Sequence, residues 1–111
     1  MKEVKAFVRY ERANDVIKGL RDNDFMSITV TEAEGTGRFT RPDDKPSLRF
    51  AVTHSKMAKL ELICKKDDVG RIVNLINTHG GTGRKGDGII YVSEVEQIYK
   101  VKTGEESADE L

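Results

Sequence analysis

The sequence predicts an α+β domain in which two β-α-β units build one four-stranded antiparallel sheet with both helices on the same face. Two segments carry apolar residues at i, i+3, i+4 and i+7, the spacing of a helix that buries one side. Each lies between segments in which apolar and polar residues alternate, the pattern of a strand. With 111 residues, the chain suits a single domain spanning 1–111.

The first unit begins close to the N-terminus. Alternating apolar residues predict a strand over 4–10, and helical spacing predicts a short helix over 13–20. A second alternating run predicts a strand over 26–31, and the pattern stops after Glu32. These three elements make up one β-α-β unit.

A long irregular segment follows. From Gly35 to about Lys56, glycines, prolines and clustered charges replace any periodic pattern. A stretch of about 20 residues is long for a connection inside a compact domain and is usually functional or disordered. We expect a long mobile loop over 36–56, which could include a short strand at 50–52.

The second unit repeats the order of the first. Alternation predicts a strand over 59–64, and helical spacing predicts a helix over 69–76 with Asp67 as its N-cap. Gly80 and Gly81 are expected to end this helix.

The C-terminal part completes the second unit. Residues 89–93 and 95–101 are expected to form two short strands separated by a kink. A C-terminal loop and an acidic, frayed tail are expected over 103–111.

The resulting βαββαβ order is the ferredoxin-like arrangement. Its helices would cover one face of the sheet, while the other face also carries apolar residues, among them Phe7, Ile63 and Ile98. A partner subunit would be the natural cover for that face. A monomer with a partly apolar sheet face is the alternative that the pattern leaves open.

Composition and charge narrow the classes of function. The 19 basic residues balance the 19 acidic ones, whereas general nucleic-acid binding needs an excess of cations, so we expect no nucleic-acid partner. No apolar run approaches the ~18 residues of a membrane span, and the first strand leaves no room for a signal peptide. Cys64 is the only cysteine and cannot form an intrachain disulfide. We therefore expect a cytoplasmic protein without direct membrane insertion.

The segment Thr82-Gly83-Arg84-Lys85-Gly86-Asp87-Gly88 is the most informative motif. Its three glycines allow positive φ and can bring backbone amides together into an anion-binding array. The adjacent Arg84 and Lys85 add charge suited to phosphate. Because it runs from helix to strand, it is neither a Walker A loop nor a Rossmann fingerprint. A flexible turn is the alternative on composition alone.

Two weaker hints point to the same chemistry. Gly35-Thr36-Gly37-Arg38 is a second glycine-containing segment, at the entrance of the long loop. On a strand, Lys100 and Lys102 would point the same way and could hold a polyphosphate. The alternative is that both are solvated lysines which block the pairing of an edge strand.

Together, these motifs resemble those of the P-II family of nitrogen regulatory signal proteins. The matching stretches are Thr29-Val30-Thr31-Glu32, Gly35-x-Gly37-Arg38, Asp67-Asp68-Val69, Thr82 to Gly88, and Lys100-x-Lys102-Thr103-Gly104-Glu105. They cover almost the whole chain apart from Arg41 to Lys56. The resemblance implies a ferredoxin-like homotrimer that is not an enzyme and that binds an adenine nucleotide (ATP, ADP or AMP) at three clefts between subunits. It would control a target protein, such as a membrane transporter or an enzyme of nitrogen or carbon metabolism, through its long loop.

The resemblance also implies roles for individual residues around the base. The Gly35-x-Gly37-Arg38 segment would line one side of the cleft, with Thr29 beneath the base. Phe7 and either Ile63 or Cys64 would pack on the adenine, since a one-residue gap leaves both positions open.

The phosphate side is implied in the same way. Gly86, Asp87 and Gly88 would present backbone amides to the phosphates. Lys100 and Lys102 of the neighbouring subunit would complete the clamp.

The sequence departs from the family pattern at several of these positions. Phe39 stands where the family carries a glutamine that helps coordinate magnesium and 2-oxoglutarate, and it offers no oxygen ligand. Ile89 replaces a lysine, and Lys100 and Lys102 replace arginines, whose bidentate fork a lysine lacks. These changes weaken the case for ATP with magnesium and 2-oxoglutarate, and they leave magnesium, ADP, AMP or another small effector open.

Two other classes of function remain as alternatives. A metal-responsive ferredoxin-like trimer of the CutA-like type would need soft ligands, but His54, His79 and Cys64 show no ligand spacing. An enzyme would need a catalytic set, and Asp87 lies in a loop without an evident partner base.

Overall fold

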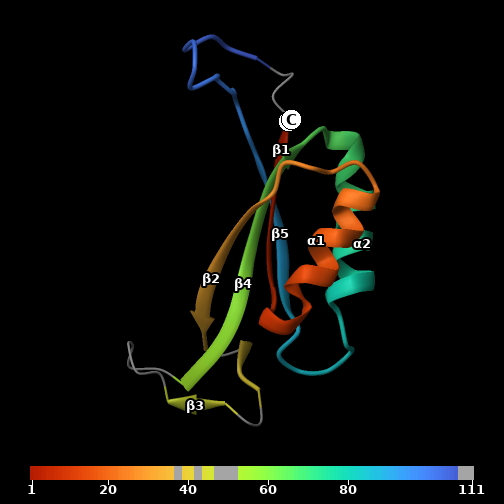
Figure 1. Ribbon diagram of the computed structural model, residues 1–111, viewed down its shortest axis with the longest axis vertical. Helices are drawn as coiled ribbons and strands as arrows, with labels where there is room; N and C mark the ends of the chain where they lie inside the picture. The colour runs from red at the N-terminus through yellow and green to blue at the C-terminus, as the bar shows by residue number, and fades with distance from the viewer. Residues whose placement is uncertain (37–38, 42–43, 47–52, 108–111) are drawn as a thin grey trace.

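The computed structural model describes residues 1–36, 39–41, 44–46 and 53–107. Two helices lie side by side on one face of an antiparallel sheet of four long strands (Figure 1). The strand order is β2-β4-β1-β5, with a two-residue strand β3 paired to β4. The elements in chain order are β1 (Lys2–Arg9), α1 (Ala13–Asp22), β2 (Thr29–Gly35), β3 (Lys45–Pro46), β4 (Thr53–Cys64), α2 (Val69–Gly80) and β5 (Gly88–Glu94). This arrangement confirms the predicted ferredoxin-like fold class.

The core lies between the sheet and the two helices. Alternate residues of the central strands are buried, because neighbouring side chains of a strand point to opposite faces. The apolar stripes of the two helices cover them. The residues with almost no exposed surface include Val4, Ala6, Leu60, Val16, Leu20, Ile72 and Ile76. Burying each leucine or isoleucine contributes roughly 1.5–3 kcal/mol.

The two helices approach each other closely at Gly19. A Cβ on Gly19 would lie 2.4 Å from Cδ2 of His79, so a larger residue there would push the helices apart. His79 lies in the last turn of α2. The helix ends at Gly80 with Gly81 as its C-cap, which confirms the predicted end.

The bounds of β2 differ from the prediction. The strand begins at Thr29 and not at residue 26, and it continues past Glu32 to Gly35. It pairs with β4 from Thr29↔Glu61 to Gly35↔Ser55. Backbone pairing with β4, and not the alternation of side chains, therefore sets its extent.

The long loop is also shorter at its C-terminal end than predicted. Strand β4 begins at Thr53, so the last four residues of the expected loop 36–56 belong to the sheet. The strand suggested at 50–52 lies outside the described residues.

The start of the second helix is another difference. A 3-10 turn, Lys66–Asp68, precedes α2, and no side-chain hydrogen bond caps either element. The prediction that Asp67 is the N-cap is therefore wrong. The 3-10 turn itself satisfies one backbone N–H at the start of the helix, because the Asp68 N–H donates to the Lys65 carbonyl at 3.0 Å.

The predicted strand over 95–101 is also wrong. Strand β5 ends at Glu94, which is paired with Lys2, the first residue of β1. One more backbone hydrogen bond follows, from the Val95 N–H to the Met1 carbonyl at 3.1 Å. The chain then leaves the sheet and forms a loop closed by two backbone hydrogen bonds, from Lys100 N–H to Glu105 and from Gly104 N–H to Lys100, both 2.8 Å. Among the described residues, the only β-bridge between its two sides is Tyr99↔Glu106, next to a backbone hydrogen bond from the Ser107 N–H to the Ile98 carbonyl at 2.9 Å.

The sheet face opposite the helices carries both apolar and charged side chains. Phe7, Ile63 and Tyr91 lie there, with a row of charged residues between them. Ile98 lies beyond the sheet, beside Ile63 in a shared cavity lining. Within the described residues, no helix is long and apolar enough to cross a bilayer.

Candidate functional site

The glycine-rich loop, residues 82–88, is held in shape by the carboxylate of Asp87. This carboxylate accepts hydrogen bonds from the backbone N–H groups of Thr82 and Gly83, both at 2.8 Å, and from the Thr82 hydroxyl. Burial alone would raise the pKa of Asp87, but the hydrogen bonds from Arg9, Thr82 and Gly83 outweigh it and hold the pKa well below its usual range. Asp87 is therefore a charged anchor of the loop.

Arg9 fastens the loop to the sheet. It comes from the end of β1, and only 5% of its surface is exposed. Its Nε donates to Oδ1 of Asp87 at 2.8 Å, and its Nη2 donates to the Lys85 carbonyl at 2.9 Å. One guanidinium thus binds both sides of the turn around Gly86.

Sequence reasoning missed Arg9. On an alternating strand, an arginine next to Val8 is indistinguishable from a solvated residue on the open face. A buried arginine needs a carboxylate, and Asp87 lies 78 positions away in the chain.

At two positions of the loop, only glycine fits, because a side chain would clash with neighbouring atoms. Gly86 has φ +94°, and a Cβ there would lie 2.6 Å from Cγ of Arg41. Gly88 has φ +105°, and a Cβ there would lie 1.8 Å from the Phe7 carbonyl oxygen. Both positions adopt the left-handed backbone that the sequence pattern led us to expect.

The entrance of the long loop packs beside the glycine-rich loop. The position of a Cβ on Gly35 would be 2.8 Å from Cβ of Phe39. The ring of Phe39 in turn lies 5.6 Å from the ring of Phe7, measured between centroids. Gly37 and Arg38, which the sequence placed in the same segment, lie outside the described residues.

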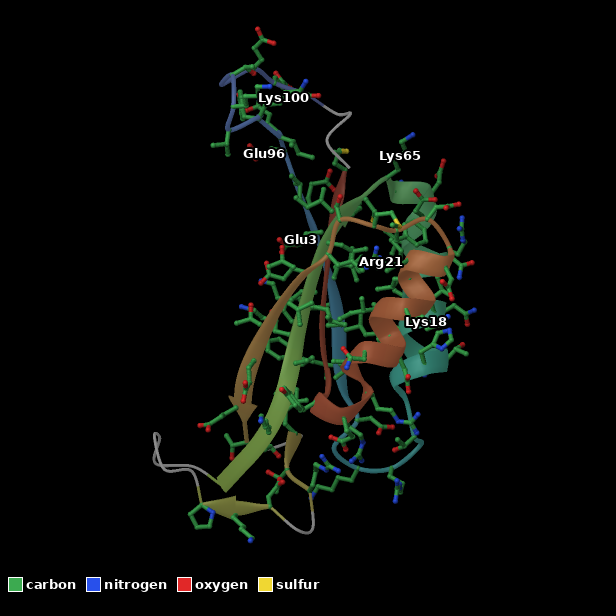
Figure 2. The ribbon with its side chains drawn as sticks, viewed as in Figure 1. Glu3, Lys18, Arg21, Lys65, Glu96 and Lys100 are labelled. Atoms are coloured by element: carbon green, nitrogen blue, oxygen red, sulfur yellow. The ribbon has the colours of Figure 1, made fainter. Side chains whose placement is uncertain are left out.

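A second group of candidate residues lies at the opposite end of the sheet. Thr29 and Ile63, with Ile98, line a cavity of about 200 Å³ there. Lys100 and Lys102 belong to the loop beyond it, at the top of Figure 1, and the side chain of Lys100 is labelled at that end in Figure 2. The expectation that the two lysines share one side of a strand is wrong, because residues 101–103 form a turn.

Ile63 and Cys64 point to opposite faces of the sheet. Cys64 is 4% exposed and belongs to the core between sheet and helices. Burial raises the pKa of its thiol. Ile63 is on the other face, the face of Phe7, and is partly exposed. A ligand on the open face can therefore reach Ile63 and not Cys64.

The structure thus sorts the candidate residues into two sets. We call the first the glycine end, which comprises Phe7, Gly35, Gly86, Asp87 and Gly88. The second is the lysine end, which comprises Thr29, Ile63, Lys100 and Lys102.

One chain does not bring these two sets together. The two ends of β2, Thr29 and Gly35, are six residues apart, about 20 Å along a strand. Phe7 pairs with Lys59, and Ile63 lies four residues further along β4, about 13 Å away. Within one chain, Thr29 therefore lies far from Gly35.

No metal site is apparent in the described part of the chain. Among those residues, no three His, Cys, Asp or Glu side chains gather closely enough to hold a metal ion.

Comparison with known proteins agrees with the fold and with the order of the motifs. The model of the family "Nitrogen regulatory protein P-II" matches residues 1–105. The nitrogen regulatory protein P-II of Bradyrhizobium diazoefficiens is 31% identical over 112 residues, which cover 100% of both chains. Those of Rhizobium meliloti and Azospirillum brasilense are each 30% identical over 112 residues, again with 100% coverage of both chains.

The fold and these matches define a signal-transduction regulator. The chain belongs to the nitrogen regulatory protein P-II family. The family predicted from the motifs is thereby confirmed.

Proposed function

We propose that this regulator is a cytoplasmic homotrimer that binds an adenine nucleotide, ATP, ADP or AMP, in the clefts between its subunits. The bound nucleotide sets the conformation of the long loop. The loop controls a target protein, such as a membrane transporter or an enzyme of nitrogen or carbon metabolism.

The separation of the glycine end and the lysine end carries this proposal. Both ends have groups suited to an anion and an apolar contact suited to a base, yet they lie at opposite ends of a molecule 46 Å long (Figure 1). A contact in which the lysine end of one subunit meets the glycine end of the next would complete the site. Repeated head to tail, such a contact closes into a ring.

Each end supplies a different part of the proposed site. Gly86 and Gly88 carry no side chains of their own, so backbone groups of this turn can approach the phosphates closely. Lys100 and Lys102 of the adjacent subunit add positive charge. Phe7 of one subunit and Ile63 of the other provide apolar surfaces for the two faces of the base.

Displacement of Phe39 would couple the site to the long loop. Its ring packs on Phe7, the surface on which we place the base. The Phe39 carbonyl also accepts a hydrogen bond from the hydroxyl of Ser55 in β4. A base that packs on Phe7 would push this ring aside and so change the start of the loop.

The low pKa of Asp87 and its hydrogen bonds within the loop support a regulatory role without catalysis. A general base works best when its pKa is near the pH of the reaction. Hydrogen bonds hold the pKa of Asp87 far below that, and they tie its oxygens to the loop itself.

Calorimetric titration of the purified protein with ATP, ADP, AMP and cyclic AMP, each with and without magnesium, tests the proposal. Light scattering gives the number of subunits in the same sample. We expect a trimer that binds at least one of the first three nucleotides. A trimer that gives no heat with any of them would contradict nucleotide binding, and a monomer would contradict the shared cleft.

A pair of matched variants tests the lysine end. Lys100→Gln combined with Lys102→Gln should weaken nucleotide binding about tenfold or more, because it removes two charges from the phosphates. Lys18→Gln combined with Arg21→Gln removes the same charge from exposed positions of α1, both labelled in Figure 2, and should leave affinity unchanged. Equal affinity of both double variants would count against the proposed cleft.

A further inference from the structure

The first residues of the long loop cover the turn of the glycine-rich loop. Cγ of Arg41 lies 2.6 Å, and the Thr40 carbonyl oxygen 3.4 Å, from the place that a Cβ on Gly86 would occupy. Gly86 itself is buried. The aliphatic stem of Arg41 thus rests on the part of the loop where we place the phosphates.

The guanidinium of Arg41 is held by Glu11. Its Nη2 lies 2.7 Å from Oε1 of Glu11, and its Nη1 donates to Oε2 at 3.2 Å. This is a two-pronged pair between a guanidinium and a carboxylate. Burial would raise the pKa of Glu11, but the hydrogen bond and charge of Arg41 lower it, together with the charge of Arg9, whose Nη1 lies 3.9 Å from Oε1 of Glu11.

Two arginines therefore flank the glycine-rich loop, and they differ in burial. Arg9 is buried and bound to Asp87 and to the Lys85 carbonyl. The side chain of Arg41 is 25% exposed, and its Glu11 partner is 52% exposed. Because both partners are partly exposed, a dissolved anion can reach the guanidinium of Arg41 and compete with Glu11 for it.

We propose that Arg41 is a phosphate-binding residue of this site and that Glu11 competes with the phosphate for its guanidinium. The inference rests on the proposed nucleotide binding. Phosphate and carboxylate both accept the planar fork of an arginine, and phosphate brings more negative charge. Ile89, directly after the glycine-rich loop, brings no charge. Arg41 supplies a cation from the other side of the turn.

The exchange also moves the loop. The backbone N–H of Arg41 donates to the carboxylate of Asp44, which accepts a hydrogen bond from the hydroxyl of Ser55 in β4. When the guanidinium turns from Glu11 to a phosphate, the backbone of Arg41 shifts, and its hydrogen bond to Asp44 shifts with it. Phosphate binding thus changes the conformation of the start of the long loop.

Titration calorimetry with ADP on three variants tests the inference. Arg41→Gln should weaken binding about tenfold, because the phosphate loses a charged partner. Glu11→Gln should tighten binding severalfold, because the competitor loses its charge while Arg41 remains. Arg21→Gln, the same change on the exposed side of α1, should bind as the wild type does. Thermal melting of each variant checks that the fold is intact.

The opposite signs of the first two changes separate this inference from a structural role. If the pair merely braces the loop, Arg41→Gln and Glu11→Gln both break it and both weaken binding, which would overturn the inference. Wild-type affinity of Arg41→Gln would overturn it too, while the proposed nucleotide site stands. A wild-type protein that binds no nucleotide would overturn the proposed function and this inference with it.

Discussion

The glycine-rich loop and the C-terminal loop lie at opposite ends of the sheet and are built by different means. In the glycine-rich loop, one buried arginine and one carboxylate tie several backbone groups together. In the loop over 100–105, two backbone hydrogen bonds close the turn, and Val101 at its tip is fully exposed. The first loop is organised by contacts within its own chain. The second is open to contacts from outside, as the proposed shared site requires.

This contrast predicts whether a substitution changes folding stability or changes binding and assembly. Changes in the glycine-rich loop should cost folding free energy in the isolated chain, because strain and buried charge are internal to it. Changes in the C-terminal loop should leave folding almost untouched and should appear in binding or assembly. The four expectations below test this contrast, from the largest effect to the smallest.

The glycines of the two loops give the sharpest comparison. Gly88→Ala should lower the free energy of unfolding by about 4 kcal/mol, because its Cβ would overlap the Phe7 carbonyl and its φ is strongly positive. Gly104→Ala should cost only about 1 kcal/mol, because its φ of +73° is strained but nothing lies within 4 Å. Urea denaturation measures both. Similar losses at the two positions would remove the contrast.

Loss of the arginine anchor should come next. Arg9→Met keeps much of the buried volume but leaves Asp87 without its guanidinium, so we expect about 3 kcal/mol lower stability in urea denaturation. Lys18→Met breaks the exposed pair with Asp22 and serves as the control, which should melt as the wild type does. An Arg9→Met protein of undiminished stability would show that the loop does not depend on this anchor.

The anchor should also make stability depend on pH. The folded chain holds the pKa of Asp87 below its ordinary value of 3.8, so the carboxylate stabilises the fold above that pH, and the gain is lost as the pH falls from there. This one group should steepen the loss of unfolding free energy by up to about 1.4 kcal/mol per pH unit below about pH 4. Asp87→Asn should lack that steepening. Parallel curves for the two proteins in acid would contradict the assignment.

The smallest effect on folding is expected at the C-terminal loop. Lys102→Gln changes an exposed side chain in a turn and should leave the melting temperature unchanged. Nucleotide affinity should nevertheless fall about fivefold, because a charged partner of the phosphates is lost. Calorimetry and thermal melting on one sample measure both. A lower melting temperature with intact affinity would reverse the roles of the two loops.

The secondary structure that the sequence predicted well depends on local rules. The helices at 13–20 and 69–76 follow from spacing along one chain segment, and the end at Gly80 and Gly81 follows from the freedom of glycine. The edges of the sheet were predicted poorly. Residues 26–28 alternate like a strand, yet β2 begins only at Thr29, where the backbone of β4 lies beside it.

The candidate site divides in the same way. Motifs in a fixed order were enough to recognise the family, because each motif is a short run of residues. The positions of these motifs in space could not be obtained from their order. The division into a glycine end and a lysine end depends on strand register, which places Phe7 beside Lys59 and away from Ile63.

The sequence by itself determined the two helices, the central strands, a loop whose glycines can adopt positive φ, and the family. These depend on side-chain spacing and backbone freedom, which are properties of neighbouring residues. Only the tertiary structure decided that Arg9 holds the glycine-rich loop, that Arg41 covers Gly86, and that the chain turns away from the sheet after Glu94. Each of these depends on groups far apart in the chain, which become neighbours only when the strands pair and the helices pack.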